Sequence, residues 1–333
     1  MRDATELILR QRTGALILLA GPELDLDQVC SGGFRLREAV FTPQRVAELA
    51  KMDGGQVVSA DVSTLLRANV QFVPDRALST TETGTRFRTA ERLARQTKSP
   101  VLAVSEEVEG VAAVYIDGRR FDLRDPRDLQ ADGNQNLISL ERLRRRLQAA
   151  EDRLTRLEVD AVVTVRDVVL LLQRAALVRR MSFQIERIVV ELGGEANLIR
   201  IQAADLMEGV NDLAAMVYED YRRRRGSRTV FDRLGRIGTE DLHDIQMVAE
   251  TLGLGELDAA TQPRGIRALT RVPHLPDGVK ETLVKHFGSF QKLLAADSEA
   301  LAKVDGVGRS RADQLRSYLD RLLQHGTPFA IPD

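Results

Sequence analysis

Short, continuous apolar runs alternate with helical patterns over the first 123 residues of the chain. Residues 15–20, for example, form an uninterrupted apolar run after a glycine, which is typical of a strand buried on both faces. Thr42 and Pro43 open a helix, with threonine as the N-cap and proline in the first turn. The predicted strands are residues 15–20, 56–59, 64–73, 101–105 and 111–116, and the predicted helices are residues 2–12, 43–52 and 85–97. This interleaving predicts an α/β domain with a mixed sheet.

The pattern becomes helical after about residue 127 and stays helical to about residue 262. Leucines recur at spacings of three and four residues, which places them on one helical face, with arginines mostly around the other face. The leucines are Leu137, Leu140, Leu143 and Leu147, and the arginines are Arg142, Arg144, Arg145 and Arg146. A second long helix carries Val162, Val165, Val168, Val169 and Leu172, and the run breaks at residues 189–194. We therefore predict an all-α spine over residues 124–262.

An apolar turn with two glycines lies between two predicted helices, residues 298–303 and 309–323. Its glycines let backbone amides and the start of the following helix face outward, where they can hold a DNA phosphate without reading bases. The turn resembles the hairpin of helix-hairpin-helix domains, and residues 272–278 form a degraded upstream partner. An ordinary helical hairpin is the alternative. The candidate DNA-binding residues are Gly306, Val307, Gly308, Arg309 and Arg311.

The composition describes a globular protein whose overall charge does not favour nucleic acid. The 333 residues include 48 lysines and arginines against 49 aspartates and glutamates, and 43% are hydrophobic. Only local clusters can therefore contact DNA. No apolar run reaches the roughly 20 residues of a membrane span, and the lone Cys30 has no partner for a disulfide. We expect a cytoplasmic protein in which Cys30 serves packing.

Histidine is absent from the first 242 residues, since the four histidines are His243, His274, His286 and His325. Chemistry in the α/β domain must therefore use carboxylates, arginines, hydroxyls and backbone groups. The cluster of residues 222–225 is four consecutive arginines. A solvated linker is the favoured interpretation of that cluster, and a phosphate-contacting patch is the alternative.

Residues 83–92 combine features that suit phosphate binding. Gly84 gives a flexible entry to a helix, Thr85 is a good N-cap, and Arg86 and Arg88 add two positive charges. Taken alone, the stretch is better explained as a capped helix with solvated arginines. Asp53, which precedes two glycines, also has two interpretations: a turn, favoured in isolation, or a carboxylate that binds a divalent metal or a sugar hydroxyl.

The two stretches together, residues 51–55 (KMDGG) and 82–92 (ETGTRFRTAER), followed by a helical spine and a helix-hairpin-helix pattern, resemble the DisA family. These are DNA-integrity-scanning diadenylate cyclases of bacteria. The resemblance extends over nearly the whole chain. It implies a cyclase domain at 1–123, a spine at 124–262 and a DNA-binding domain at 263–333. Chains of the family begin upstream of Arg2, so we expect a shortened N-terminus here.

The resemblance implies that two ATP molecules condense to cyclic di-AMP with release of two pyrophosphates. Asp53 would activate the 3′-hydroxyl together with Mg²⁺ or Mn²⁺, with Arg86 and Arg88 as the other catalytic residues. The residues implied to bind the nucleotide are Gly54, Phe72, Thr85, Arg86, Phe87, Arg88 and Thr89. One site holds one ATP, so two domains must meet face to face in a homo-oligomer, an octamer in the family. The implied DNA partner is branched or damaged, bound without sequence specificity by a nucleoid-associated protein.

The sequence departs from the family pattern at three positions, of which positions 55 and 87 matter for the expected activity. The family's Asp-Gly-Ala is Asp53-Gly54-Gly55 here, its Arg-His-Arg is Arg86-Phe87-Arg88, and Phe72 stands where a leucine is usual. Phe87 can neither bind metal nor form the hydrogen bonds of an imidazole. Two hypotheses follow: a diadenylate cyclase with reduced activity, or a catalytically impaired, ATP-binding scaffold that senses DNA.

Overall fold

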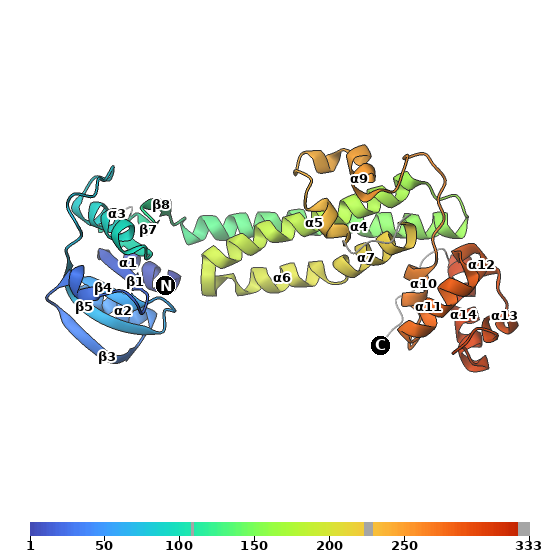
Figure 1. The fold of residues 1–333 in the computed structure, drawn as a ribbon, viewed down its shortest axis with the longest axis horizontal. Helices are drawn as coiled ribbons and strands as arrows, with labels where there is room; N and C mark the ends of the chain where they lie inside the picture. Colours follow the sequence, from blue (N-terminus) through green and yellow to red (C-terminus); the bar gives the residue numbers. More distant parts are fainter. Residues whose placement is uncertain (108–109, 223–228, 326–333) are drawn as a thin grey trace. The chain divides into compact units, whose positions relative to one another are not determined.

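The computed structural model of the chain describes residues 1–107, 110–222 and 229–325 (Figure 1). The chain divides into two compact units. Unit 1 is Met1–Asp132 with Ile188–Asn197, and unit 2 is Gly133–Arg187 with Leu198–Asp333. Helices α4 (Pro126–Val159) and α5 (Val165–Leu192) contribute residues to both units. The predicted division into three domains stays a prediction.

Unit 1 is built on one mixed, eight-stranded sheet with the strand order β2-β5-β4-β1-β6-β7-β8, in which β3 also pairs with β5. Strands β1 and β4 are parallel, and the other pairs are antiparallel. The strands are β1 Ala15–Ala20, β2 Cys30–Ser31, β3 Phe34–Val40, β4 Gly55–Ser59, β5 Thr64–Phe72, β6 Val101–Val104, β7 Ala112–Ile116 and β8 Arg119–Asp122. The prediction of a mixed α/β sheet is confirmed.

Both faces of this sheet are covered by helices, which explains the continuous apolar runs of its central strands. Successive residues of β1 show the alternation: Leu18 packs in the cluster that contains α3 (Thr85–Thr97), and Ile17 packs in the cluster with α1 (Arg2–Gln11) and α2 (Pro43–Ala50). Thr42 caps α2 as predicted, its hydroxyl accepting the Arg45 N–H at 3.2 Å. Cys30 is buried, and burial raises the pKa of its thiol to about 11.

Unit 2 is helical, as the sequence pattern predicted. Its helices besides α4 and α5 are α6 Asn197–Met207, α7 Val210–Tyr221, α8 Val230–Leu234, α9 Ile245–Leu252, α10 Ile266–Thr270, α11 Asp277–Phe287, α12 Phe290–Ala295, α13 Ser298–Ala302 and α14 Arg309–His325. The predicted leucine face of α4 is buried at Leu137, Leu140 and Leu147. Val162 was wrongly placed in the second helix, because α5 begins at Val165 and Val162 is exposed before it. No helix in the described part of the chain could cross a membrane.

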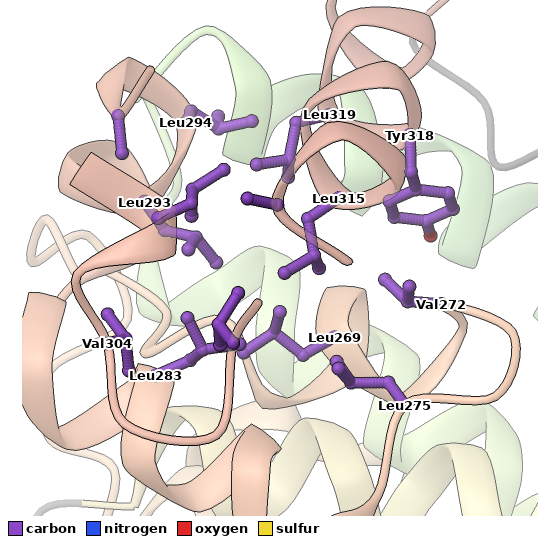
Figure 2. Packing of buried hydrophobic residues seen from close by; sticks show 14 of the residues in the cluster. Leu269, Val272, Leu275, Leu283, Leu293, Leu294, Val304, Leu315, Tyr318 and Leu319 are labelled. Carbon is purple, nitrogen blue, oxygen red and sulfur yellow. The ribbon is translucent and has the colours of Figure 1, made fainter. Parts of the chain in front are cut away.

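Two similar helix pairs form the last part of unit 2, the first pair being α10 and α11 and the second pair α13 and α14. Equivalent positions of the two pairs are buried together in one core, as Figure 2 shows for Leu283 and Leu315. These equivalent positions are Leu269 and Leu301, Val272 and Val304, Leu275 and Val307, and Leu283 and Leu315. The turns also match, because His274 (φ 56°) and Gly306 (φ 82°) both have left-handed backbones. The structure thus contains two similar helix pairs, and their assignment as helix-hairpin-helix motifs stays a prediction.

A buried ionic network holds α10 to α4 and α7 within unit 2. The Asp220 carboxylate on α7 accepts the backbone N–H groups of Ile266 and Arg267 at 2.7 and 2.8 Å, which caps α10. The Arg267 guanidinium pairs with Glu158 on α4 and donates to the Thr155 hydroxyl at 3.0 Å. Burial, followed by the nearby charge of Glu158, raises the pKa of Asp220 to about 6. The network therefore buries the carboxylates of Asp220 and Glu158. Backbone N–H groups stabilise the first, and the Arg267 guanidinium stabilises the second.

Candidate functional site

A cavity of about 990 Å³ lies at the end of the unit 1 sheet where the parallel strands β1 and β4 begin. Most of the predicted nucleotide site meets there. The predicted residues that line it are Asp53, Gly54, Phe72, Thr85, Arg86, Phe87 and Thr89. Arg88 does not line the cavity. Its side chain is exposed, and its Nε donates to the Glu82 carbonyl at 3.4 Å.

Arg86 reaches the cavity over the backbone of Gly14. A Cβ atom at Gly14 would lie 2.3 Å from the Arg86 Cζ atom, so a side chain at position 14 would displace the guanidinium from this position. The Arg86 Nη2 atom pairs with Glu106 and lies 3.7 Å from the Asp53 carboxylate. The side chain of Arg86 is only 25% exposed, and that of Asp53 is 89% exposed. A fixed cation therefore lies beside two carboxylates at the cavity wall.

The carboxylates of Asp53 and Glu106 fit the role of partial metal ligands. Mg²⁺ commonly takes one or two protein carboxylates and completes its coordination with water and substrate phosphates. Both side chains line the cavity, and both approach the same nitrogen of Arg86. Among the described residues, no group of three or more His, Cys, Asp or Glu side chains could hold a metal alone. A metal here would need oxygen ligands from a bound nucleotide.

The turn that carries Asp53 is fixed by close packing of its glycines. A Cβ at Gly54 would meet the side-chain oxygen of Asn69 at 2.3 Å, and a Cβ at Gly55 would meet the Phe72 ring at 2.2 Å. The phenyl ring of Phe72 thus occupies the space that an alanine methyl at position 55 would need. The departures at positions 55 and 72 are therefore two halves of one packing change. Asp53 itself has a left-handed backbone, with φ at 61°, which aspartate tolerates.

The helix that carries Arg86 begins differently from the prediction. Gly84, with φ at 79°, is the N-cap of α3, and Thr85 is its first residue, so the assignment of Thr85 as N-cap was wrong. The positive φ requires glycine at this position rather than a capping threonine. The backbone N–H groups of the first helical turn have no acceptor within the helix and are available to an anion. Thr85 and Thr89 line the cavity beside them.

Side chains of α3 hold the loop that precedes it, residues 78–82. Buried Glu91 accepts the Thr80 hydroxyl and the Thr81 N–H. Arg92 donates to the Leu78 carbonyl at 2.8 Å, and Arg95 donates to the Ser79 carbonyl at 3.0 Å. The cavity wall formed by this loop is therefore anchored to the helix behind it, and the arginines of α3 that follow Arg88 serve structure.

The glycine turn of the second helix pair lies at the surface of unit 2. Gly306 needs its left-handed backbone, and the Arg311 guanidinium donates to the Gly306 carbonyl at 2.9 Å. Gly308 and Arg309 are exposed, whereas Val307 is buried in the core shown in Figure 2. The backbone N–H of Val307 donates to the Val304 carbonyl at 3.0 Å, so it is already engaged within the turn. Position 276 of the first pair, equivalent to Gly308, is a proline without an N–H group.

The cavity-lining residues that sequence reasoning missed include Gly14, Glu82, Glu106 and Arg120. Gly14 carried a signal, because it separates a helix from an apolar strand, but glycines in such positions usually only mark a boundary. Glu82 lies in the stretch 82–92 but was given no role there, and Glu106 and Arg120 lie in segments without a motif. The predicted cluster of residues 222–225 cannot be placed, because residues 223–225 lie outside the described residues.

Comparisons with known proteins agree over both units. Residues 2–119 match the family described as DisA bacterial checkpoint controller nucleotide-binding, and residues 123–260 match the DisA bacterial checkpoint controller linker region. The chain is 42% identical to the DNA integrity scanning protein DisA of Acidothermus cellulolyticus, over 97% of this chain and 90% of that protein. It is 43% identical to the protein of the same description from Kineococcus radiotolerans, over 97% and 92% of the two chains.

Proposed function

The chain belongs to the DisA family, and we propose that it is a diadenylate cyclase that condenses two ATP molecules into cyclic di-AMP and two pyrophosphates. The proposal rests on one observation above the others: Arg86 and Asp53 meet at 3.7 Å on the wall of a large cavity that also contains the start of α3. A triphosphate needs such a cation and free backbone amides, and a 3′-hydroxyl needs a carboxylate to accept its proton.

The cavity residues would have separate roles in this reaction. Arg86 and the first amides of α3 would bind phosphate oxygens, and Thr85 and Thr89 would add hydroxyl donors. Asp53 would accept the proton of the attacking hydroxyl. Mg²⁺ or Mn²⁺, when bound by Asp53 and the nucleotide, would neutralise charge on the transferred phosphate. Each cavity would hold one ATP, so the reaction needs two copies facing each other, and we propose a homo-oligomer of the octameric type.

A direct assay separates this proposal from the alternative of an impaired scaffold. The purified protein, incubated with labelled ATP and Mn²⁺, is expected to form cyclic di-AMP, measured by chromatography. Phe87→His is expected to raise the rate, because an imidazole adds a donor beside Arg86 that phenylalanine lacks. ATP binding without any cyclic di-AMP would refute the cyclase and leave the scaffold. An unchanged rate in Phe87→His would show that the cyclase does not need the imidazole.

We further propose that the second helix pair binds DNA phosphates at its glycine turn, without reading bases. Gly308 and the N-terminus of α14 offer backbone N–H groups at the surface, and Arg309 adds charge there. Binding of this kind weakens as salt rises. Branched or damaged DNA is the expected target of the DNA-coupled cyclase.

Gly308→Glu is expected to lower the affinity for branched DNA by roughly 10- to 100-fold, since a hydrogen bond to a charged group contributes about 1.5–3 kcal/mol. A Cβ at Gly308 meets no atom within 4 Å, so the fold of the helix pair should persist. Fluorescence anisotropy with a labelled DNA junction measures the affinity. Ser139→Glu adds the same charge at a partly exposed position of α4 and should bind like the unmodified protein. Equal affinities of the two variants would exclude the glycine turn.

A further inference from the structure

We propose that Arg120, on strand β8, is the second arginine of the nucleotide site and contacts the phosphates of the bound ATP. This inference rests on the proposed function, which supplies the ligand. The sequence motif suggests Arg88 as the partner of Arg86, but the structure gives Arg88 an exposed side chain that does not line the cavity. Arg120 lines the same cavity as Arg86. The two cations of the site thus come from separate segments of the chain.

Arg120 is held in a defined position by three neighbours. Its Nη1 atom donates to Glu82 at 3.0 Å, and its Nε atom donates to Asp122 at 2.7 Å. Its Cζ atom lies 5.1 Å from the centroid of the Phe87 ring, within the range of a cation–π contact. A guanidinium with five donors keeps further N–H groups for a ligand after these two hydrogen bonds. A preorganised arginine loses little entropy when it binds phosphate.

The position of Arg120 points to phosphate rather than to the base or the sugar. Its partner Glu82 lies two residues before Gly84, the N-cap of α3, where the free amides of the first turn would hold phosphate oxygens. Glu82 belongs to the loop that Glu91 anchors through Thr80 and Thr81. Arg120 therefore lies beside the predicted phosphate site and on a support that does not depend on the ligand.

Phe87 gains a role from this arrangement. The ring lines the cavity and packs against the core of unit 1, and its outer face carries the guanidinium of Arg120. An apolar ring at position 87 cannot donate a hydrogen bond, but it can hold a cation that does. The positive charge that faces the ligand then comes from position 120.

The test measures binding of 3′-deoxyATP, which lacks the attacking hydroxyl and cannot be cyclised, and of 3′-deoxyadenosine, which lacks phosphates. Arg120→Gln is expected to weaken 3′-deoxyATP binding by roughly 10- to 100-fold and to leave 3′-deoxyadenosine binding unchanged. Arg120→Lys keeps the charge but not the forked guanidinium. Its affinity for 3′-deoxyATP should lie between those of the unmodified protein and Arg120→Gln. The matched control is Arg119→Gln, the neighbouring exposed arginine of β8, which points to the other face of the strand.

Three results would overturn the assignment. One is 3′-deoxyATP affinity within twofold of the unmodified protein for both Arg120 variants. Another is an equal loss for both ligands, which would give Arg120 a role in packing or base contact. A larger loss from Arg88→Gln than from Arg120→Gln would likewise return the second cation to Arg88. Absence of cyclic di-AMP from the unmodified protein would refute the cyclase alone, because these binding measurements need no turnover.

Discussion

Asp53→Asn is expected to lower the rate of cyclic di-AMP formation by roughly 10²–10⁴-fold, the range for loss of a general base. The carboxylate of Asp53 is exposed at the cavity and lies 3.7 Å from Arg86. Asparagine keeps the size of the side chain and also tolerates the left-handed backbone that Asp53 adopts at φ 61°. It cannot accept the proton of a 3′-hydroxyl and is a weaker metal ligand. The variant should therefore fold normally but form cyclic di-AMP more slowly.

Two measurements separate this effect from a general loss of structure. Cyclic di-AMP is quantified by chromatography at saturating ATP and Mn²⁺, and 3′-deoxyATP binding is measured in parallel. Glu48→Gln makes the same carboxylate-to-amide change in an exposed pair with Lys51 and should keep the rate of the unmodified protein. A rate within tenfold of that protein for Asp53→Asn would remove Asp53 from the catalytic machinery.

The turn at Asp53 shows how far the sequence determines the candidate site. The stretches 51–55 and 82–92 together predict that Asp53 and Gly54 belong to the site, whereas aspartate before two glycines favours a turn when it is taken alone. They do not predict how the chain packs around Gly55. The structure shows that the Phe72 ring fills this space from the end of β5. Packing between residues this far apart in the chain is a tertiary property.

The polar strands mark a second limit of prediction. Central strands were predicted because both faces are buried and their apolar runs are continuous. Strand β8 carries four exposed residues and therefore has no apolar run. Strand β3 begins with alternating apolar and charged residues, which is typical of a half-buried strand, but it was not among the predicted strands. Arg120 lies on β8. Its neighbours Glu82 and Phe87 come from the α3 region, and only the β7–β8 hairpin brings them together.

The helix pairs of unit 2 mark a third limit. The sequence predicted the second turn from its glycines and a degraded partner from residues 272–278. The equivalence of His274 with Gly306 became visible only in the backbone, since both residues adopt the left-handed region. Its consequence for binding follows from chemistry, because Pro276 has no N–H to offer where Gly308 has one. We therefore expect the two turns to contribute unequally to DNA affinity.

The ionic network around Arg267 links this DNA-binding candidate to the spine helices of unit 2. Arg267 pairs with Glu158 and lies 3.6 Å from Glu151, and all three side chains are buried. Asp220 caps the same helix, α10, from α7. Buried ions cost solvation energy, so the network stabilises the fold only while each charge keeps its partner. Removal of Arg267 should therefore lower the free energy of unfolding by more than the buried area of its side chain would suggest.

Arg267→Met is expected to lower the free energy of unfolding of unit 2 by about 3–5 kcal/mol, because it leaves Glu158 and Asp220 buried without their cation. Urea unfolding followed by tyrosine near-ultraviolet circular dichroism measures this loss. The chain has no tryptophan and four tyrosines, and Tyr218, Tyr221 and Tyr318 lie in unit 2. The signal therefore reports mainly on this unit.

The control for Arg267 is Arg166→Met, which removes the arginine of an exposed pair with Asp258 and should cost at most about 1 kcal/mol. Equal losses in the two variants would show that the buried network contributes no more than a surface pair. The double variant Arg267→Met with Glu158→Gln distinguishes the cost of an unpaired charge from the loss of packing. It should recover part of the free energy of unfolding, because the unpaired carboxylate, rather than the missing contact, accounts for much of the loss. No recovery would instead assign the loss to the packing of the Arg267 side chain.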